Sequence, residues 1–151
     1  MKAVVIRVSR AALTADGQSR GEMGKGLLVL LGIGGEDTRR QATYLAEKCA
    51  ALRIVEDENG KMNKSLADVG GSMMVVSNFT LYADCSRGRR PDFFHAAKPD
   101  VAIPLYEFFV EEIGRLQVPC ITGVFGADMQ IDHVNDGPVT LIMDTDQMLS
   151  K

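Results

Sequence analysis

The chain has 151 residues, of which 46% are hydrophobic and 25% charged, and its formal net charge is −3. This composition is ordinary for a globular protein and argues against a disordered chain, and the length suits one domain over residues 1–151. No apolar run approaches the ~20 residues of a membrane helix, and Arg7 and Arg10 make the N-terminus a poor signal peptide. We therefore expect a cytoplasmic protein without a membrane partner.

The first third of the chain predicts three strands and a helix. Apolar residues alternate over Lys2–Ser9, which indicates a half-buried strand, and Ala11–Gln18 is expected to return as a second strand. Leu27–Ile33 is almost wholly apolar, as in a strand covered on both faces. Asp37 is expected to cap a helix that runs to about Leu52, because the apolar positions between them have helical spacing.

The middle of the chain predicts a hairpin, a strand and a second helix. Arg53–Glu56 is expected to form a short strand, and Asn59-Gly60 is a hairpin signal. Ser72–Leu81 is predicted as a strand. The second helix is expected to run from about Asp100 to Gln117, with Pro104 tolerated in its first turn. The stripe of apolar residues on this helix is expected to face the core: Leu105, Phe108, Phe109, Ile113 and Leu116.

Three closing strands complete the predicted elements. They are expected at Cys120–Val124, Met129–Val134 and Val139–Asp144. Two main helices and a strand-rich remainder indicate a layered α+β, or mixed α/β, domain.

A glycine-rich turn after the third predicted strand gives a first functional hypothesis. Gly32-Ile33-Gly34-Gly35 resembles a dinucleotide-binding turn, but Asp37 stands where the third glycine belongs. Acidic residues at a helix N-terminus stabilise the helix and repel a pyrophosphate. We interpret this segment as a glycine turn before a capped helix and predict no cofactor.

Charged residues and cysteines narrow the choice of partners. The negative net charge argues against a protein that wraps nucleic acid, and DNA is not expected as a partner. Arg87, Arg89 and Arg90 nevertheless concentrate positive charge, which suits contact with a few terminal nucleotides. The three cysteines are widely spaced and form no metal-ligand or redox pair, so we predict no metal site and free thiols.

Two polar segments can carry chemistry. In Ser77–Asp84 an apolar strand runs into hydroxyl and amide side chains, and its backbone N–H groups can face a developing oxyanion. In Asn135–Thr140, Gly137 permits close approach of the backbone to a ligand, and the bond to Pro138 can be cis. Taken alone, each segment is equally compatible with a structural role, as a solvated strand end or an ordinary turn.

Together these segments resemble the D-aminoacyl-tRNA deacylase family. Its bacterial members carry Ser-Gln-Phe-Thr-Leu-Tyr-Ala-Asp, a basic Gly-Arg-Arg-Pro stretch, Phe-Gly-Ala-Asp-Met and Asn-Asp-Gly-Pro-Val-Thr. The matching stretches here, in the same order, are Ser77–Asp84, Gly88–Pro91, Phe125–Met129 and Asn135–Thr140. The chain departs from the family at Asn78, where the family usually has Gln.

The resemblance implies a homodimer that hydrolyses the ester between a D-amino acid, or glycine, and the terminal adenosine of tRNA. It implies a largely antiparallel, partly barrel-like sheet. It also implies that Gly137-Pro138 is held cis and reaches into the partner's pocket, where its carbonyls meet the α-amine and exclude L side chains. By the same resemblance Arg7 braces this loop, and Phe125 and Met129 are candidates for the adenine pocket.

The resemblance leaves the chemical step open between two mechanisms. Thr80 as a nucleophile needs a base, and the motif contains none. We prefer attack by water with help from the ribose 2′-hydroxyl, with the Phe79 and Thr80 N–H groups at the oxyanion and the Thr80 side chain positioning the substrate. Ser77 and Asn78 are expected to bind its polar end, and His95 and His133 are expected to be structural.

Two other functions remain open from sequence. A non-catalytic module that binds RNA ends would keep the pocket without the chemistry, for instance through the change at Asn78. A related editing enzyme with Gly137-Pro138 in trans would admit a small L residue such as alanine.

Overall fold

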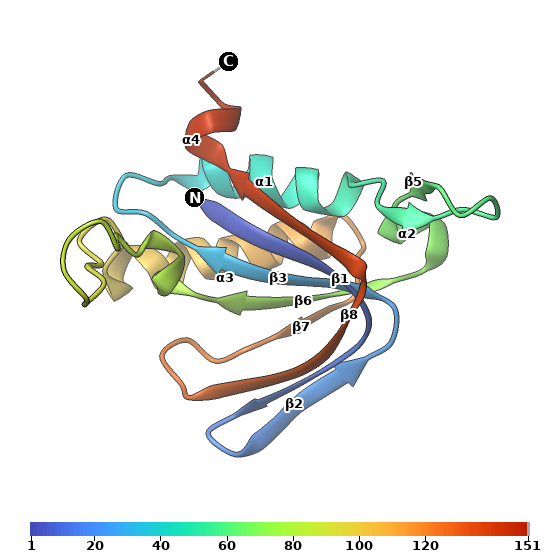
Figure 1. Cartoon of the computed structure of the whole chain (residues 1–151), viewed down its shortest axis with the longest axis horizontal. Coiled ribbons are helices and arrows are strands. Elements are labelled where there is room, and N and C mark those ends of the chain that lie inside the picture. The colour runs from blue at the N-terminus through green and yellow to red at the C-terminus, as the bar shows by residue number, and fades with distance from the viewer. Residues whose placement is uncertain (151) are drawn as a thin grey trace.

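The computed structural model describes residues 1–150 and is built around one curved six-stranded sheet (Figure 1). β1 pairs with β2, β3 and β8 in antiparallel register, whereas β3–β6 and β6–β7 are parallel. Arg20 of β2 donates to the Thr122 carbonyl of β7 (3.2 Å), so the ends of the strand path approach and nearly close a barrel. The strands are β1 Lys2–Ala15, β2 Gln18–Met23, β3 Gly26–Gly32, β6 Ser72–Ser77, β7 Cys120–Thr122 and β8 Met129–Asp144.

Two helices cover one face of this sheet. α1 (Arg39–Ala51) and α3 (Pro99–Arg115) pack against each other and against the strands, and Leu45 and Phe109 are fully buried between them. A second cluster, which includes Leu13, Leu28 and Met74, fills the inside of the curved sheet. The predicted mixed α/β class, with a largely antiparallel and partly barrel-like sheet and two main helices, is confirmed.

The first predicted strand boundary was wrong. Residues 2–15 form one strand, because Ala11, Leu13 and Ala15 continue the buried side of the alternation through the polar Ser9-Arg10 step. The chain reverses later, at Asp16 and Gly17, both with positive φ, and β2 follows. The predicted hairpin therefore exists, but its turn lies several residues further on.

The cap of the first helix and the position of Pro104 in the second also differ from the predictions. Thr38, not Asp37, caps α1: its hydroxyl accepts from Arg40 N (3.3 Å), and the Gln41 side chain accepts from Thr38 N. α3 begins at Pro99, so Pro104 lies in its second turn, on the exposed side where the freed carbonyl faces water. On this helix Leu105, Phe109 and Ile113 are buried as predicted, Phe108 is half-buried and Leu116 is exposed.

The last predicted strands merge, and the strand before them is shorter than predicted. β8 is continuous from Met129 to Asp144 and carries a bulge opposite Ile6–Val8. β6 ends at Ser77, because its neighbour β3 ends at Gly32, and residues Phe79–Tyr82 turn into the short 3₁₀ helix η1. The segment that carries the Ser77–Asp84 motif is thus a strand end followed by a tight helical turn.

Small elements complete the structure. β4 (Val55–Glu56) and β5 (Met62–Lys64) form the hairpin predicted at Asn59-Gly60, although β4 is shorter than expected. The four-residue helices α2 (Leu66–Val69) and α4 (Thr145–Met148) were not predicted. Within residues 1–150, no helix is both long and apolar enough to cross a bilayer.

Candidate active site

The candidate site is built at the C-terminal end of β6. Asn78 N donates to the Leu31 carbonyl (2.8 Å), which extends the β3–β6 pairing by one bond, and η1 then begins at Phe79. Because Met73–Val76 of β6 are buried, the polar residues that follow are held at the edge of a packed sheet.

A cavity of about 580 Å³ opens beside this strand end. It is lined by five of the residues singled out from sequence: Ser77, Asn78, Phe79, Phe125 and Met129. Its other lining residues were not predicted, namely Phe93, Ala96, Ala97, Lys98, Pro99, Gly126 and Ala127. The Phe93 ring meets the Phe79 ring edge to face, with centroids 5.0 Å apart. The Phe93-Phe94 pair just after the basic stretch was the available signal for Phe93.

Two backbone N–H groups stand free at the start of η1. The Leu81 N–H bonds to the Asn78 carbonyl (3.3 Å), but within residues 1–150 the N–H groups of Phe79 and Thr80 donate to no acceptor. Phe79 is 56% exposed. Two successive unpaired donors at a helical turn form an arrangement that can stabilise a negatively charged oxygen.

The Thr80 hydroxyl has a partner that cannot activate it. It donates to the side-chain oxygen of Asn78, and an amide oxygen is not a base at any working pH. Neither histidine lines the cavity: His95 lines a different hollow, and His133 lies on β8 opposite Ala11. Asn78 therefore has a defined contact despite being shorter than the Gln usual in the family.

The second predicted segment forms the bulge in β8. The Gly137–Pro138 peptide bond is cis, and Gly137 has φ +132°. The Asn135 side chain closes the bulge by accepting from Val139 N (3.1 Å) and donating to the Thr140 hydroxyl (2.8 Å).

Arg7 holds the base of this bulge. Its side chain is almost fully buried and donates to the Asp136 carbonyl (3.0 Å) and to the Ile54 carbonyl (2.9 Å). It also lies 3.6 Å from the carboxylates of Glu56 and Asp136, so its charge is compensated.

Within one chain, the bulge and the cavity are far apart. Asn135 pairs with Val8, Val8 pairs with Gly26, and Gly26 pairs with Ser72 at the start of β6. The cavity lies at the other end of β6, five residues further along, a distance of about 17 Å at the usual rise of a strand. Neither Gly137 nor Pro138 lines the cavity of its own chain.

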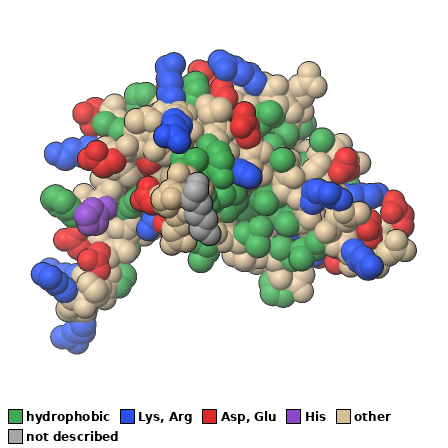
Figure 2. Space-filling model, turned by 90° about the horizontal axis from the view of Figure 1, so that it is seen from above, with side chains coloured by type: hydrophobic (Ala, Val, Ile, Leu, Met, Phe, Trp, Pro, Cys, Tyr) green, Lys and Arg blue, Asp and Glu red, His purple; other side chains and the backbone are tan. Residues whose placement is uncertain are grey.

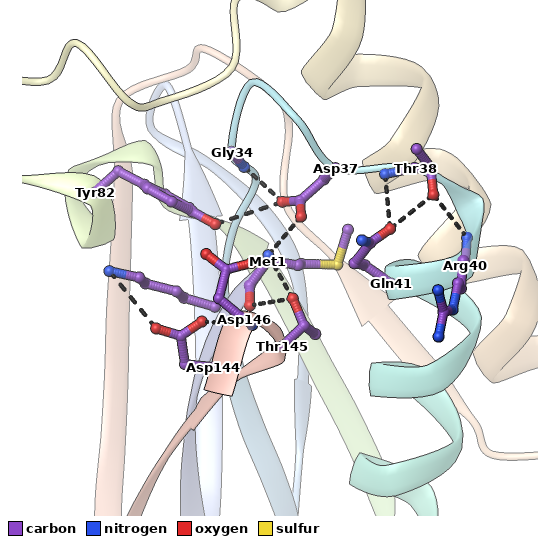
Figure 3. Close-up of polar contacts among 11 residues, drawn as sticks. Met1, Gly34, Asp37, Thr38, Arg40, Gln41, Tyr82, Asp144, Thr145 and Asp146 are labelled. Atoms are coloured by element: carbon purple, nitrogen blue, oxygen red, sulfur yellow. Dashed lines mark hydrogen bonds and ion pairs between the residues drawn. The ribbon is translucent and has the colours of Figure 1, made fainter. Parts of the chain in front are cut away.

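A second hollow, of about 400 Å³, lies on the other side of η1, and its walls include Tyr82, Asp144 and Asp146. Figure 3 shows its inner wall, where the Asp37 carboxylate accepts from the N-terminal ammonium group of Met1 (2.6 Å) and from Gly34 N (2.6 Å). The Met1 ammonium group also contacts the Thr145 hydroxyl (2.7 Å).

This second hollow explains the glycine-rich turn. A Cβ on Gly34 would lie 2.8 Å from the Tyr82 hydroxyl, and one on Gly32 would lie 3.0 Å from Leu81 Cβ. These glycines let η1 pack onto the end of β3. The Gly34 N–H, which a bound phosphate would need, already donates to the Asp37 carboxylate. The turn is structural.

Other reactive groups lie outside the cavity. Burial raises the pKa of the Cys49 thiol to about 12 and that of Cys120 to about 11, so both stay protonated at neutral pH. Cys85 is exposed. In the part of the chain that the structure describes, no three His, Cys, Asp or Glu side chains are grouped so that they could hold a metal ion.

Comparison with known proteins identifies relatives along the whole chain. Residues 4–144 match the family model described as D-Tyr-tRNA(Tyr) deacylase. The D-aminoacyl-tRNA deacylase of Thermus aquaticus is 54% identical over 147 residues, which covers 97% of each chain. That of Parabacteroides distasonis is 52% identical over 146 residues, or 96% of this chain and 97% of the relative.

Two solved structures are similar in fold. A structure described as c-Myc DNA Unwinding Element Binding Protein superposes with a TM-score of 0.88 at 39% identity, covering 95% of this chain and 98% of that one. A probable eukaryotic D-amino acid tRNA deacylase superposes with a TM-score of 0.80 at 15% identity, covering 94% and 97%. The second likeness concerns the fold alone.

Proposed function

This chain belongs to the family of D-aminoacyl-tRNA deacylases and is a hydrolase, and from this premise we propose that it cleaves the ester between a D-amino acid, or glycine, and the 3′-terminal adenosine of tRNA. The observation that carries the proposal is the cavity at the end of β6, where apolar walls meet Phe79, whose N–H group is free together with that of the next residue, Thr80. L-Aminoacyl-tRNA is spared.

The chemical step is attack by water on the ester carbonyl carbon. The carbonyl oxygen gains negative charge, and the N–H groups of Phe79 and Thr80 stabilise it. When the intermediate collapses, the bond between the carbonyl carbon and the ribose oxygen breaks. That oxygen takes a proton derived from the water, with help from the neighbouring ribose 2′-hydroxyl, and the amino acid leaves as a free acid.

The Thr80 side chain positions the substrate in this mechanism. Its hydroxyl donates to the Asn78 amide oxygen, so its lone pairs remain available to accept from the substrate. Ser77, at the last position of β6, adds a second hydroxyl at the polar end of the cavity. Phe125 and Met129 form the apolar wall that suits the face of the adenine base.

Selection against L-amino acids requires a second copy of the chain. The Gly137–Pro138 bulge is exposed and lies about 17 Å from its own cavity along the sheet, so only the partner's bulge can reach it. In a symmetric homodimer each cavity receives the other chain's bulge. Its carbonyls then bind the α-amine and leave no space for an L side chain.

The same geometry makes glycine a substrate. Inversion at the α-carbon exchanges the positions of the hydrogen and the side chain, and glycine has hydrogens at both positions. A filter that acts by a steric clash therefore admits glycine with the D-amino acids.

We place the enzyme in the cytoplasm, where its substrate, the acceptor end of aminoacyl-tRNA, is found.

A hydrolysis assay tests this function. The purified protein is incubated with D-tyrosyl-, L-tyrosyl- and glycyl-tRNA, and the remaining ester is measured over time against a buffer control. D-Tyrosyl- and glycyl-tRNA are expected to be hydrolysed and L-tyrosyl-tRNA to persist at the buffer rate. Binding of all three without hydrolysis would leave an RNA-end binding module, and cleavage of the L ester would refute the filter.

A further inference from the structure

The basic loop, residues Asp84–Asp92, is connected directly to the walls of the cavity. It follows η1 and is closed at its base by two backbone hydrogen bonds between Asp84 and Asp92 (2.7 and 2.9 Å). Phe93, the next residue, packs on Phe79, and Ala97 N donates to the Ile33 carbonyl (2.8 Å). The loop is therefore an anchored extension of the cavity rim.

Positive charge is concentrated in this part of the chain. Residues 83–98 carry a net charge of +2, because Arg87, Arg89, Arg90 and Lys98 outnumber Asp84 and Asp92. The rest of the chain carries −5, which gives the total of −3. Among residues 1–150, none of the three arginines forms an ion pair or a side-chain hydrogen bond, and all are exposed. Figure 2 shows Lys and Arg side chains standing out at the end of the molecule where this segment lies in Figure 1.

We propose that residues Asp84–Asp92 form a docking platform for tRNA, on which Arg87, Arg89 and Arg90 bind phosphates of the acceptor end while the terminal nucleotide enters the cavity. One guanidinium group can bind two phosphate oxygens at once. Because these arginines form no ion pair within residues 1–150, they can bind phosphate without breaking an existing contact. Lys98, which lines the cavity, continues the positive path inward. This inference rests on the proposed function.

The surroundings of the loop set the direction of the RNA. The hollow on the Tyr82 side of η1 is lined by five carboxylates, of which Asp37 is paired with the Met1 ammonium group and Asp144 with Lys2. The other three, Glu36, Asp84 and Asp146, leave a negative charge that repels phosphate. The cavity on the Phe79 side has Lys98 and no carboxylate among its lining residues. An RNA strand that leaves the cavity is therefore expected to cross the arginine loop and to avoid the acidic hollow.

The test compares a triple variant with a matched control. In the loop variant Arg87, Arg89 and Arg90 are each replaced by Gln. The control removes the same charge at three exposed lysines outside the loop that form no ion pair within residues 1–150: Lys25→Gln, Lys48→Gln and Lys61→Gln. Both are assayed on D-tyrosyl-tRNA and on D-tyrosyl-adenosine, which has the terminal nucleoside and no phosphates, and their binding to uncharged tRNA is followed by fluorescence anisotropy.

The loop variant is expected to raise KM for D-tyrosyl-tRNA and to leave kcat, and activity on D-tyrosyl-adenosine, unchanged. A protein that makes three phosphate contacts on a single strand binds roughly 20-fold more weakly at about 200 mM salt than at about 50 mM. The loop variant should lose this part of the salt dependence of tRNA binding. The control should keep it.

The possible failures are distinguishable. Equal losses on both substrates would mean that the loop merely supports Phe93, and unchanged tRNA binding would mean that it binds no phosphate; either result overturns the proposal. If the parent hydrolyses neither substrate, the proposed function fails. Binding of uncharged tRNA that depends on the three arginines would still support the platform in that case.

Discussion

The two hollows on either side of η1 use similar polar groups in opposite ways. On the Tyr82 side the Asp37 carboxylate is fully occupied by the Met1 ammonium group and Gly34 N, with the Tyr82 hydroxyl at 3.4 Å (Figure 3). On the Phe79 side the N–H groups of Phe79 and Thr80 have no acceptor within residues 1–150. Satisfied groups hold the fold together, whereas unsatisfied groups at the rim of a cavity are available to a substrate.

The comparison predicts that changes on the Tyr82 side affect stability and changes on the Phe79 side affect rate. The largest effect is expected from Asp37→Ala, which leaves the fully buried Met1 ammonium group without its counter-ion. Breaking a buried pair from one side costs about 3–5 kcal/mol in the free energy of unfolding. Urea denaturation measures this loss, and kcat of the folded protein should not change.

A control for Asp37→Ala exists in the same hollow. Asp146 is exposed, and its carboxylate forms no ion pair or hydrogen bond within residues 1–150. Asp146→Ala should change stability by less than about 0.5 kcal/mol. Equal losses of stability in the two variants would mean that the total negative charge of the hollow, rather than the Met1–Asp37 pair, is responsible.

The next effect, on rate, is expected at Gly137, far from the cavity of its own chain. A Cβ there would lie 2.8 Å from Val139 Cγ2 and 2.9 Å from Val139 N, so Gly137→Ala must displace the bulge. We expect hydrolysis of D-tyrosyl-tRNA to fall at least tenfold, the equivalent of about 1.4 kcal/mol. Gly60→Ala, in the β4–β5 hairpin and also at positive φ but with nothing within 4 Å of an added Cβ, should leave the rate unchanged.

Mixing two defective chains tests whether the site is shared. Ala127→Trp should fill the cavity and inactivate the chain that carries it. In a mixed dimer with Gly137→Ala, one site carries both defects and the other carries neither, so re-annealed mixtures should regain about a quarter of the parent activity. Failure to regain any activity would place the bulge and the cavity in the same chain's site.

A smaller effect on rate is expected from Thr80→Ala. Loss of one positioning hydrogen bond costs about 1 kcal/mol, which corresponds to a decrease of about fivefold in kcat/KM with stability unchanged. Thr80→Ser keeps the hydroxyl and should restore most of the activity. Complete loss in the Ala variant, together with an acyl group trapped on Thr80 in the parent, would instead make Thr80 the nucleophile.

The sequence predicted local features better than the connections between them. The apolar runs of β3 and β6 and the helical stripe around Phe109 are local patterns, and each was found. The cap of α1 was misplaced because Asp37 is bound by Met1, a residue that no local pattern connects to it. Within the cavity, Ser77–Phe79 were accessible through their motif, whereas Ala96 and Lys98 lie in no motif and line the cavity only because the chain returns there from a distant segment.

The smallest effect is expected from Tyr82→Phe, which removes the 3.4 Å contact with Asp37. Because this bond is long and Asp37 keeps its two shorter donors, the free energy of unfolding at pH 7 should fall by no more than about 0.5 kcal/mol. The variant becomes informative at high pH. Burial, and then the charge of Asp37, raise the pKa of Tyr82 well above its ordinary value of 10.0.

Above pH 10 the unfolded chain therefore loses the Tyr82 proton while the folded chain keeps it. The folded state then binds more protons, so stability must decrease as pH rises from there. Tyr82→Phe removes this loss, and the two unfolding curves should converge or cross between pH 10 and 11. Tyr106, whose pKa is also raised by burial, remains in both proteins, so its contribution cancels in the difference. A constant difference between parent and variant from pH 7 to 11 would show that Tyr82 ionises as easily in the folded protein as in water.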